Sequence, residues 1–249
     1  MHENPLHPFE LHAWGELAPF GIDIALNKAV VMMWIVVALA TWLLYWAGRE
    51  RRLVPTRLQS LAELLVEFIR GIVLDTMGTE GMRFFPFVAT LFLFILFCNM
   101  LGLVPGFYTV TSQIVVTAAF ALFVYGMSLV VGFALHGVKF LGILVPPGTP
   151  LWLLPLMVPI ELVSQLARPV ALAVRLFANM TAGHTILAVL FGMALSLPLL
   201  IGWLPFAFTI AINGLEVGIA FIQAYIFTVL TCVYIGDAIN LHGHAGGTH

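Results

Sequence analysis

The sequence predicts an all-α integral membrane protein with about five membrane-embedded helices and one amphipathic helix at the membrane surface. Of its 249 residues, 61% are hydrophobic and only 9% are charged, whereas a soluble domain is about one quarter charged. Several uncharged stretches approach or exceed the length that a helix needs to cross a bilayer. No polar region is long enough to form its own core, so we expect a single membrane domain over residues 1–249.

The N-terminal part predicts one span followed by one surface helix. Residues 1–28 are polar and acidic, and the uncharged stretch 29–47 that follows is long enough to cross the hydrocarbon core. Arginines come next, so the positive-inside rule places residues 1–28 outside and the arginines in the cytoplasm. Residues 57–77 carry apolar side chains at helical spacing and charges on other faces, which indicates an amphipathic cytoplasmic helix. The alternative, a soluble core helix, has no soluble core to join.

Residues 84–138 predict a transmembrane hairpin. No acidic or basic residue other than histidine lies between Arg83 and Lys139, and that length is enough for two spans. Pro105-Gly106 supplies the turn. Because Arg83 and Lys139 flank the hairpin, both of its ends are expected in the cytoplasm and its tip outside.

Residues 151–237 predict the last two membrane helices. The segment divides into apolar stretches at roughly 151–192 and 204–237, separated near Pro198. A helix over the first stretch would be about 60 Å long, twice the hydrocarbon core. It must therefore be tilted, kinked or split, and the sequence leaves these alternatives open. The tail 241–249 is short and polar.

Two arginines stand in the first of these apolar stretches. A charge at the centre of a bilayer costs from about 3 to more than 10 kcal/mol, depending on the method. Arg168 precedes Pro169, so a snorkelling side chain at a helix end remains an open alternative for it. Long apolar sequence continues beyond Arg175, which makes Arg175 the stronger functional candidate. After Arg175 there is no further Lys or Arg, and the only acids are Glu216 and Asp237.

Polar residues recur at seven-residue spacing in both stretches. Seven residues are nearly two helical turns, so residues at this spacing lie near one face. The first stretch carries three charged residues and then an amide one turn further on, and the second carries two acids and an amide: Glu161, Arg168, Arg175 and Asn179; Glu216, Gln223 and Asp237.

A short connection would make these two helices antiparallel neighbours. An alignment that sets Arg175 level with Gln223 brings together two further polar pairs, which are Glu161 with Asp237 and His184 with Glu216. Intramembrane carboxylates and imidazoles are the usual proton-relay groups, whereas a guanidinium, with a pKa above 12, exchanges no proton. We therefore predict two proton-accessible vestibules divided by a fixed positive charge. A simple buried hydrogen bond between His184 and Glu216 remains the alternative for that pair.

These segments resemble subunit a of the F-type rotary ATP synthase, the membrane stator subunit. The resemblance rests on three stretches and on the order of segments over nearly the whole chain: residues 168–183 (RPVALAVRLFANMTAG), 222–234 (IQAYIFTVLTCVY) and 99–105 (NMLGLVP). It implies that the last two helices form a long, strongly tilted antiparallel hairpin. It also implies that Arg175 is the essential arginine facing the ring of c subunits. The implied supporting polar residues are Asn179, Gln223 and Arg168. His184 and Glu216 would line the outer proton half-channel, and Glu161 and Asp237 the cytoplasmic one.

The resemblance also implies partners and a location. The partners are the c ring, peripheral-stalk b-type subunits, the rest of the ATP synthase and membrane lipid, with no nucleic acid, cofactor or bound metal and no catalysis by this chain alone. The location is a bacterial inner membrane, with the C-terminus in the cytoplasm. Some bacterial members carry Glu at position 184 and His at position 216. This chain exchanges the pair, as mitochondrial-type members do.

Two other functions compete with this interpretation. A stand-alone secondary transporter or ion channel would be expected to show an internal repeat and a substrate site at broken helices. We find no convincing repeat in the sequence. A purely structural anchor would leave the intramembrane charges unexplained.

Overall fold

A computed structural model describes residues 13–17, 24–49, 56–104, 110–145 and 151–239. Several expectations therefore lie outside the described residues. They concern most of the N-terminal segment 1–28, the turn at Pro105-Gly106 and the tail 241–249.

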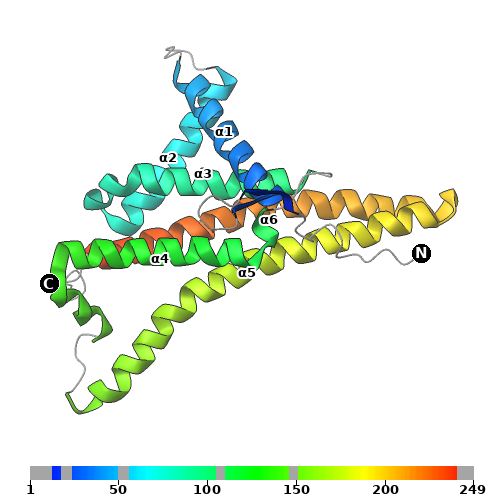
Figure 1. Cartoon of the computed structure of the whole chain (residues 1–249). Helices are drawn as coiled ribbons and strands as arrows, with labels where there is room; N and C mark the ends of the chain where they lie inside the picture. The colour runs from blue at the N-terminus through cyan, green and yellow to red at the C-terminus, as the bar shows by residue number, and fades with distance from the viewer. Residues whose placement is uncertain (1–12, 18–23, 50–55, 105–109, 146–150, 240–249) are drawn as a thin grey trace. The chain divides into compact units, whose positions relative to one another are not determined.

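Helices make up nearly all of the described chain (Figure 1). The six α-helices are α1 (Lys28–Arg49), α2 (Arg57–Met77), α3 (Phe85–Gly102), α4 (Ile114–His136), α5 (Leu154–Ser196) and α6 (Leu199–Ile239). Five of them are long and apolar enough to cross a membrane, and α2 is the one that is not. The predicted class, with about five membrane helices and one further amphipathic helix, is confirmed.

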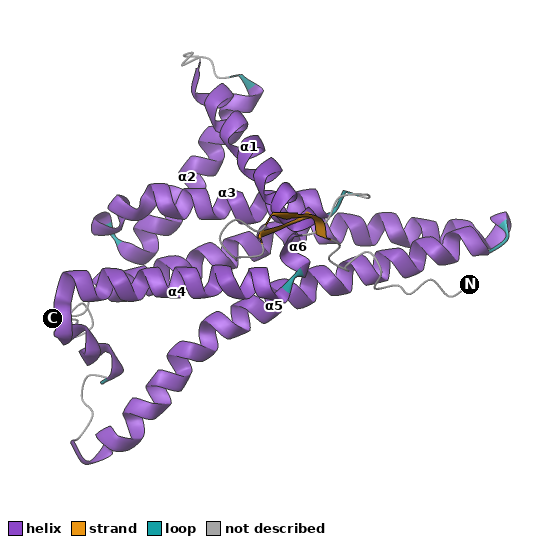
Figure 2. Cartoon of the chain, viewed as in Figure 1, coloured by secondary structure: helices purple, strands orange, loops and turns teal. Residues whose placement is uncertain are grey.

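Short 3₁₀ segments and one small ribbon complete the described elements (Figure 2). The 3₁₀ segments are η3 (Thr79–Phe84), η4 (Val110–Ser112), η5 (Gly137–Leu144) and η6 (Leu151–Leu153). The strands β1 (Ala13–Leu17) and β2 (Ile24–Asn27) pair antiparallel, with Leu17 opposite Ile24. This ribbon was not predicted from the sequence. Its pairing is local and involves no membrane helix.

The two longest helices answer one question that the sequence left open. α5 is a single helix of 43 residues that contains both Pro159 and Pro169, so the first apolar stretch is not split. α6 has 41 residues and contains Pro205. One turn after this proline, the Thr209 hydroxyl donates a hydrogen bond of 2.9 Å back to the Pro205 carbonyl, a local contact that threonine commonly makes within helices.

The chain divides into two compact units, of which the first comprises Met1–Ala62, Leu93–Val116 and Leu176–Ala224. Its apolar cluster is built from α1, the second half of α3 and η4, through Met32, Val36, Cys98 and Val110. Asn99 is completely buried in this unit, and its amide donates a 3.4 Å hydrogen bond to the Ala220 carbonyl of α6. The amide thus joins α3 to α6.

The second unit comprises Glu63–Phe92, Thr117–Arg175 and Tyr225–His249. Aromatic contacts join its helices. The ring of Phe68 on α2 lies 5.9 Å from that of Phe92 on α3 and 5.8 Å from that of Tyr225 on α6, between centroids. Tyr125 on α4 meets Tyr234 on α6 edge to face at 6.1 Å.

The apolar side chains of α2 that recur at helical spacing are buried over only part of the helix. Ile69, Ile72 and Val73 are buried, whereas Leu58 and Leu61 near the start of the helix are each 50% exposed. The buried part of the stripe lies in the second unit, where the side chains of α3 and α6 contact Phe68. The second half of α2 therefore packs its apolar side chains against α3 and α6.

We expect Phe92→Ala to destabilise the protein by about 3–5 kcal/mol, because the truncated side chain leaves a cavity that its neighbours fill only partly. Phe92 is fully buried against Phe68. Phe206→Ala is the matched control, because the Phe206 ring on α6 is 50% exposed. The measurement is the thermal unfolding temperature of each purified variant in the same detergent. Equal losses for the two variants would contradict this account of the packing.

Candidate functional site

The second half of α5 and the first half of α6 form an antiparallel hairpin in the first unit (Figure 1, yellow and orange). α5 ends at Ser196, and Pro198 precedes the first residue of α6. A Cβ added at Gly202 would lie only 2.8 Å from the Ala194 carbonyl oxygen. The two helices therefore begin the hairpin in close backbone contact, which requires glycine at position 202.

The second close approach of this hairpin involves a carboxylate. A Cβ added at Gly183 would lie 2.7 Å from Cδ of Glu216 and still nearer to its Oε1. The Glu216 side chain thus lies directly against the α5 backbone. Glu216 is only 8% exposed, and neither carboxylate oxygen has a hydrogen-bond partner among the described residues. An ionised carboxylate in such surroundings costs several kcal/mol unless other groups compensate its charge, so this group is suited to proton uptake and release.

The same approach sets the level of His184. Gly183 lies opposite Glu216, so His184, the next residue on α5, is within one residue of that level. Setting Arg175 level with Gln223 in the two antiparallel helices predicted that His184 and Glu216 lie within two residues of one level. His184 is half-buried and takes part in a polar or ring contact of its own. Its role in proton transfer stays a prediction.

Two neutral polar residues near this pair were not among the predicted site residues. The Thr181 hydroxyl and the Asn213 side-chain oxygen are buried and lack hydrogen-bond partners within the described part of the chain. Thr181 is two residues from Gly183, and Asn213 is three residues from Glu216. The sequence could have pointed to both, because each is a polar residue within one helical turn of a predicted site residue.

The predicted supporting amides belong to this unit as well. Gln223 is 3% exposed, and its side-chain nitrogen has no hydrogen-bond partner among the residues described. Asn179 is half-buried on α5. Within the described part of the chain, no hydrogen bond joins Asn179 to Gln223, so each is placed by its own helix.

The second unit brings together Arg168, Asp237 and a residue that the sequence analysis missed. Tyr234 is 5% exposed, and its hydroxyl has no hydrogen-bond partner in the described residues. Arg168 and Asp237 both lie close enough to act electrostatically on that hydroxyl. Tyr234 precedes Asp237 by three residues on α6, so the helical spacing was the signal that could have found it.

Glu161 lies in the same unit but is held within its own helix. Its Oε1 accepts a 3.0 Å hydrogen bond from Nε2 of Gln165, one turn along α5. The predicted pairing of Glu161 with Asp237 has no direct contact to support it. Asp237 takes part in a contact of its own.

Arg175 is exposed, although two leucines close to it on α5 are buried. Leu172 is 2% exposed and Leu176 is fully buried, whereas Val174 beside Arg175 is 46% exposed. A guanidinium on an otherwise apolar helix surface is unfavourable against lipid. This exposure is therefore suited to an acidic partner on another chain. The structure contains no metal-binding group of three His, Cys, Asp or Glu residues in the region it describes.

Comparison with known proteins identifies the family. The family model described as ATP synthase A chain matches residues 30–236. A relative from Magnetococcus marinus, called ATP synthase subunit a, is 50% identical over 243 residues, which cover 96% of this chain and 94% of its own. This chain belongs to the ATP synthase A chain family. Proteins of the same name from Allorhizobium ampelinum and Pelagibacter ubique are 48% and 44% identical, and the matches cover 98% and 97% of this chain.

Membership of the ATP synthase A chain family has two consequences for the site. It sets aside the stand-alone transporter or channel that the sequence left as an alternative. Together with the five long apolar helices, it makes the chain a multi-pass membrane protein. The matched region includes Arg175, His184 and Glu216, and ends one residue before Asp237.

We expect Gly183→Ala to destabilise the hairpin by about 1–3 kcal/mol, the usual cost of overpacking, because the new methyl group would overlap the Glu216 carboxylate. Gly192→Ala, on the same helix, meets nothing within 4 Å and serves as the control. The thermal unfolding temperature of the two purified variants is the measurement. If Gly183→Ala proved as stable as Gly192→Ala, the close approach would be disproved.

Proposed function

We propose that this chain is the proton-channel stator subunit of a rotary ATP synthase. It forms two offset aqueous half-channels that carry protons to and from a ring of c subunits and couple the proton gradient to ATP synthesis. The match to the ATP synthase A chain family over residues 30–236 carries this proposal. The chain acts as part of the ATP synthase complex and is not catalytic alone.

The surroundings proposed for the chain follow from the charge pattern and from its family. It contacts the c ring and peripheral-stalk b-type subunits, in a bacterial inner membrane. The N-terminus lies outside and the C-terminus in the cytoplasm, because the arginines after α1 favour the cytoplasmic side. Arg49, at the end of α1, and Arg57, at the start of α2, are the described members of this arginine group.

The outer half-channel uses His184 and Glu216. Its support is the buried Glu216 carboxylate against Gly183, at the level of His184. Thr181 and Asn213 contribute further buried oxygens nearby in sequence. Such a cluster of polar atoms supplies donors and acceptors along which protons pass between water molecules.

Arg175 separates the two half-channels. Its guanidinium holds a fixed charge and cannot relay a proton. It repels a passing hydronium ion, and it favours the ionised form of a ring carboxylate that comes near. The exposure of Arg175 on α5 supports a role toward another chain, and Asn179 and Gln223 support it as polar residues of the adjoining helix segments.

The cytoplasmic half-channel uses Glu161 and Asp237. We add Arg168 and Tyr234 to this group, because Arg168 and Asp237 both act electrostatically on the Tyr234 hydroxyl. Arg168, which is exposed on α5, is proposed as a supporting residue of this half-channel.

The proton cycle follows from these assignments. A proton enters from outside past His184 and Glu216 and neutralises a ring carboxylate, which then rotates through lipid. When that site returns to the stator, Arg175 favours ionisation, and the proton leaves toward Glu161 and Asp237. Each proton delivers about 2.3 kcal/mol per 100 mV of membrane potential, so a direct leak past Arg175 would waste this energy.

We expect Arg175→Ala to abolish ATP-driven proton pumping in inverted membrane vesicles, because the barrier between the half-channels is lost. Arg175→Lys is also expected to fail, since a compact ammonium does not reproduce the broad guanidinium. Pumping is followed by the quenching of a pH-sensitive dye. Arg70→Ala, which removes an exposed arginine of α2, is the control and should pump normally. Coupled pumping by Arg175→Ala at the control rate would refute the assignment.

We expect the exchange His184→Glu with Glu216→His to retain more pumping than either single change, because both titratable groups are then kept at one level of the hairpin. The single variants place two like groups together and should lose at least about tenfold in rate, as general acid–base groups contribute 10²–10⁴-fold. The same dye assay compares the three variants. A double variant no better than the singles would show that the two positions do not act as a pair.

A further inference from the structure

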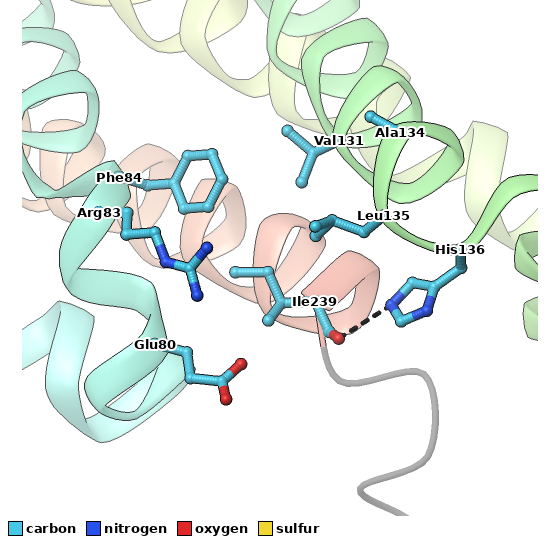
Figure 3. A pocket seen from close by; sticks show the side chains of 8 residues that line it. All are labelled: Glu80, Arg83, Phe84, Val131, Ala134, Leu135, His136 and Ile239. Carbon is cyan, nitrogen blue, oxygen red and sulfur yellow. Dashed lines mark hydrogen bonds between the residues drawn. The ribbon is translucent and has the colours of Figure 1, made fainter.

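A cleft in the second unit lies apart from the residues assigned to the proton path. It has a volume of about 340 Å³ and is lined by η3, the end of α4 and the end of α6. This volume falls within the roughly 300–1,000 Å³ of small-ligand pockets. Figure 3 shows Glu80 and Arg83 on one side of the cleft and His136 on the other.

Arg83 supplies the positive charge of the cleft. It is exposed, and no ion pair joins it to Glu80 in the part of the chain described, although both line the cleft. Figure 3 marks no hydrogen bond between the Glu80 carboxylate and the Arg83 guanidinium. The cleft therefore offers a cation and an anion as separate binding groups.

His136 faces these two groups and is fixed in place. Its Nε2 lies 3.0 Å from the Ile239 carbonyl oxygen, the last residue of α6. A carbonyl only accepts, so Nε2 carries the hydrogen and donates it. Nδ1 is left for a ligand. It accepts a hydrogen bond in the neutral ring and donates one in the protonated ring.

The remaining walls of the cleft are apolar. They come from the side chains of Phe84, Val131, Ala134, Leu135 and Ile239. The wall residues belong to α4, to α6 and to η3, which leads into α3. These three α-helices are long and apolar enough to cross the membrane. Free phosphate would gain nothing from such walls, whereas the acyl chains of a lipid would bury apolar area against them. Basic pockets between membrane helices are known to bind phospholipid headgroups.

We propose that this cleft binds a phospholipid whose headgroup carries an amine, such as phosphatidylethanolamine. The Arg83 guanidinium binds the phosphodiester as a charge-assisted donor, and His136 lines the opposite side of the cleft. The Glu80 carboxylate binds the ammonium group. The acyl chains begin along the wall formed by Phe84 and Leu135. Glu80 decides the headgroup, because a purely anionic lipid would place its negative charge beside a carboxylate.

The test uses the intact complex that contains this chain, reconstituted in nanodiscs of equal parts phosphatidylethanolamine and phosphatidylglycerol. Native mass spectrometry counts the phospholipids retained after transfer into detergent. The wild type is expected to retain one more phosphatidylethanolamine per chain than Arg83→Gln, whose retention at this site falls about tenfold on loss of a charge-assisted hydrogen bond. Arg70→Gln, which removes an exposed arginine of α2, should match the wild type.

A second variant tests the headgroup. Glu80→Gln is expected to keep the extra phospholipid but to lose the preference for phosphatidylethanolamine over phosphatidylglycerol. An excess of inorganic phosphate should displace neither lipid. The proposal is overturned if Arg83→Gln retains as much lipid as Arg70→Gln, if the wild type prefers phosphatidylglycerol, or if inorganic phosphate empties the site.

Discussion

The close approach of α5 and α6 at Gly183 and Glu216 is the constraint on which the outer polar cluster depends. Only a residue without a Cβ leaves room for the carboxylate against the facing helix. Buried ionisable groups are seldom the most stabilising choice, since well-packed apolar side chains of similar volume often serve stability as well or better. The presence of an acid at this contact is therefore better explained by its chemistry than by packing.

The few polar groups of the chain are separated from its lipid-compatible surface. Glu216 and Gln223 are almost completely buried, whereas Val189 on α5 and Phe208 on α6 are 51% and 55% exposed. Apolar side chains on the outside of these helices suit hydrocarbon, and polar side chains inside avoid the cost of meeting it. Arg168 and Arg175 are exceptions among the described residues of α5, because both are charged and exposed on an apolar helix. The proposed contact with the c ring would explain the exposure of Arg175.

α6 contributes to both proposed half-channels and to the headgroup cleft. Its middle part carries Glu216 and Gln223, and its last turns carry Tyr234 and Asp237. The last carbonyls of a helix lack partners within the helix, and His136 satisfies that of Ile239. The end of α6 is thus fixed by a side chain that also lines the proposed headgroup cleft, two residues beyond Asp237. A lipid bound there would contact the helix that carries the proposed cytoplasmic exit.

The sequence by itself determined the class of the protein, the approximate place of each long helix and the polar residues worth examining. Uncharged length and the cost of charge in hydrocarbon are local properties, so they can be read along the chain. Helical spacing also predicted that His184 and Glu216 lie at one level. The β1–β2 ribbon escaped prediction because its pairing depends on turn geometry and weak strand propensity.

Only the tertiary structure decided which polar atoms are buried and what they meet. α5 proved to be one helix despite its prolines, because the bonds that a proline removes are few beside those the rest of the helix retains. Tyr234 joined Arg168 and Asp237, while Glu161 turned to Gln165 on its own helix. Spacing along a chain states which face a residue occupies. Burial and partner choice arise from packing between segments far apart in sequence, and no single segment contains that information.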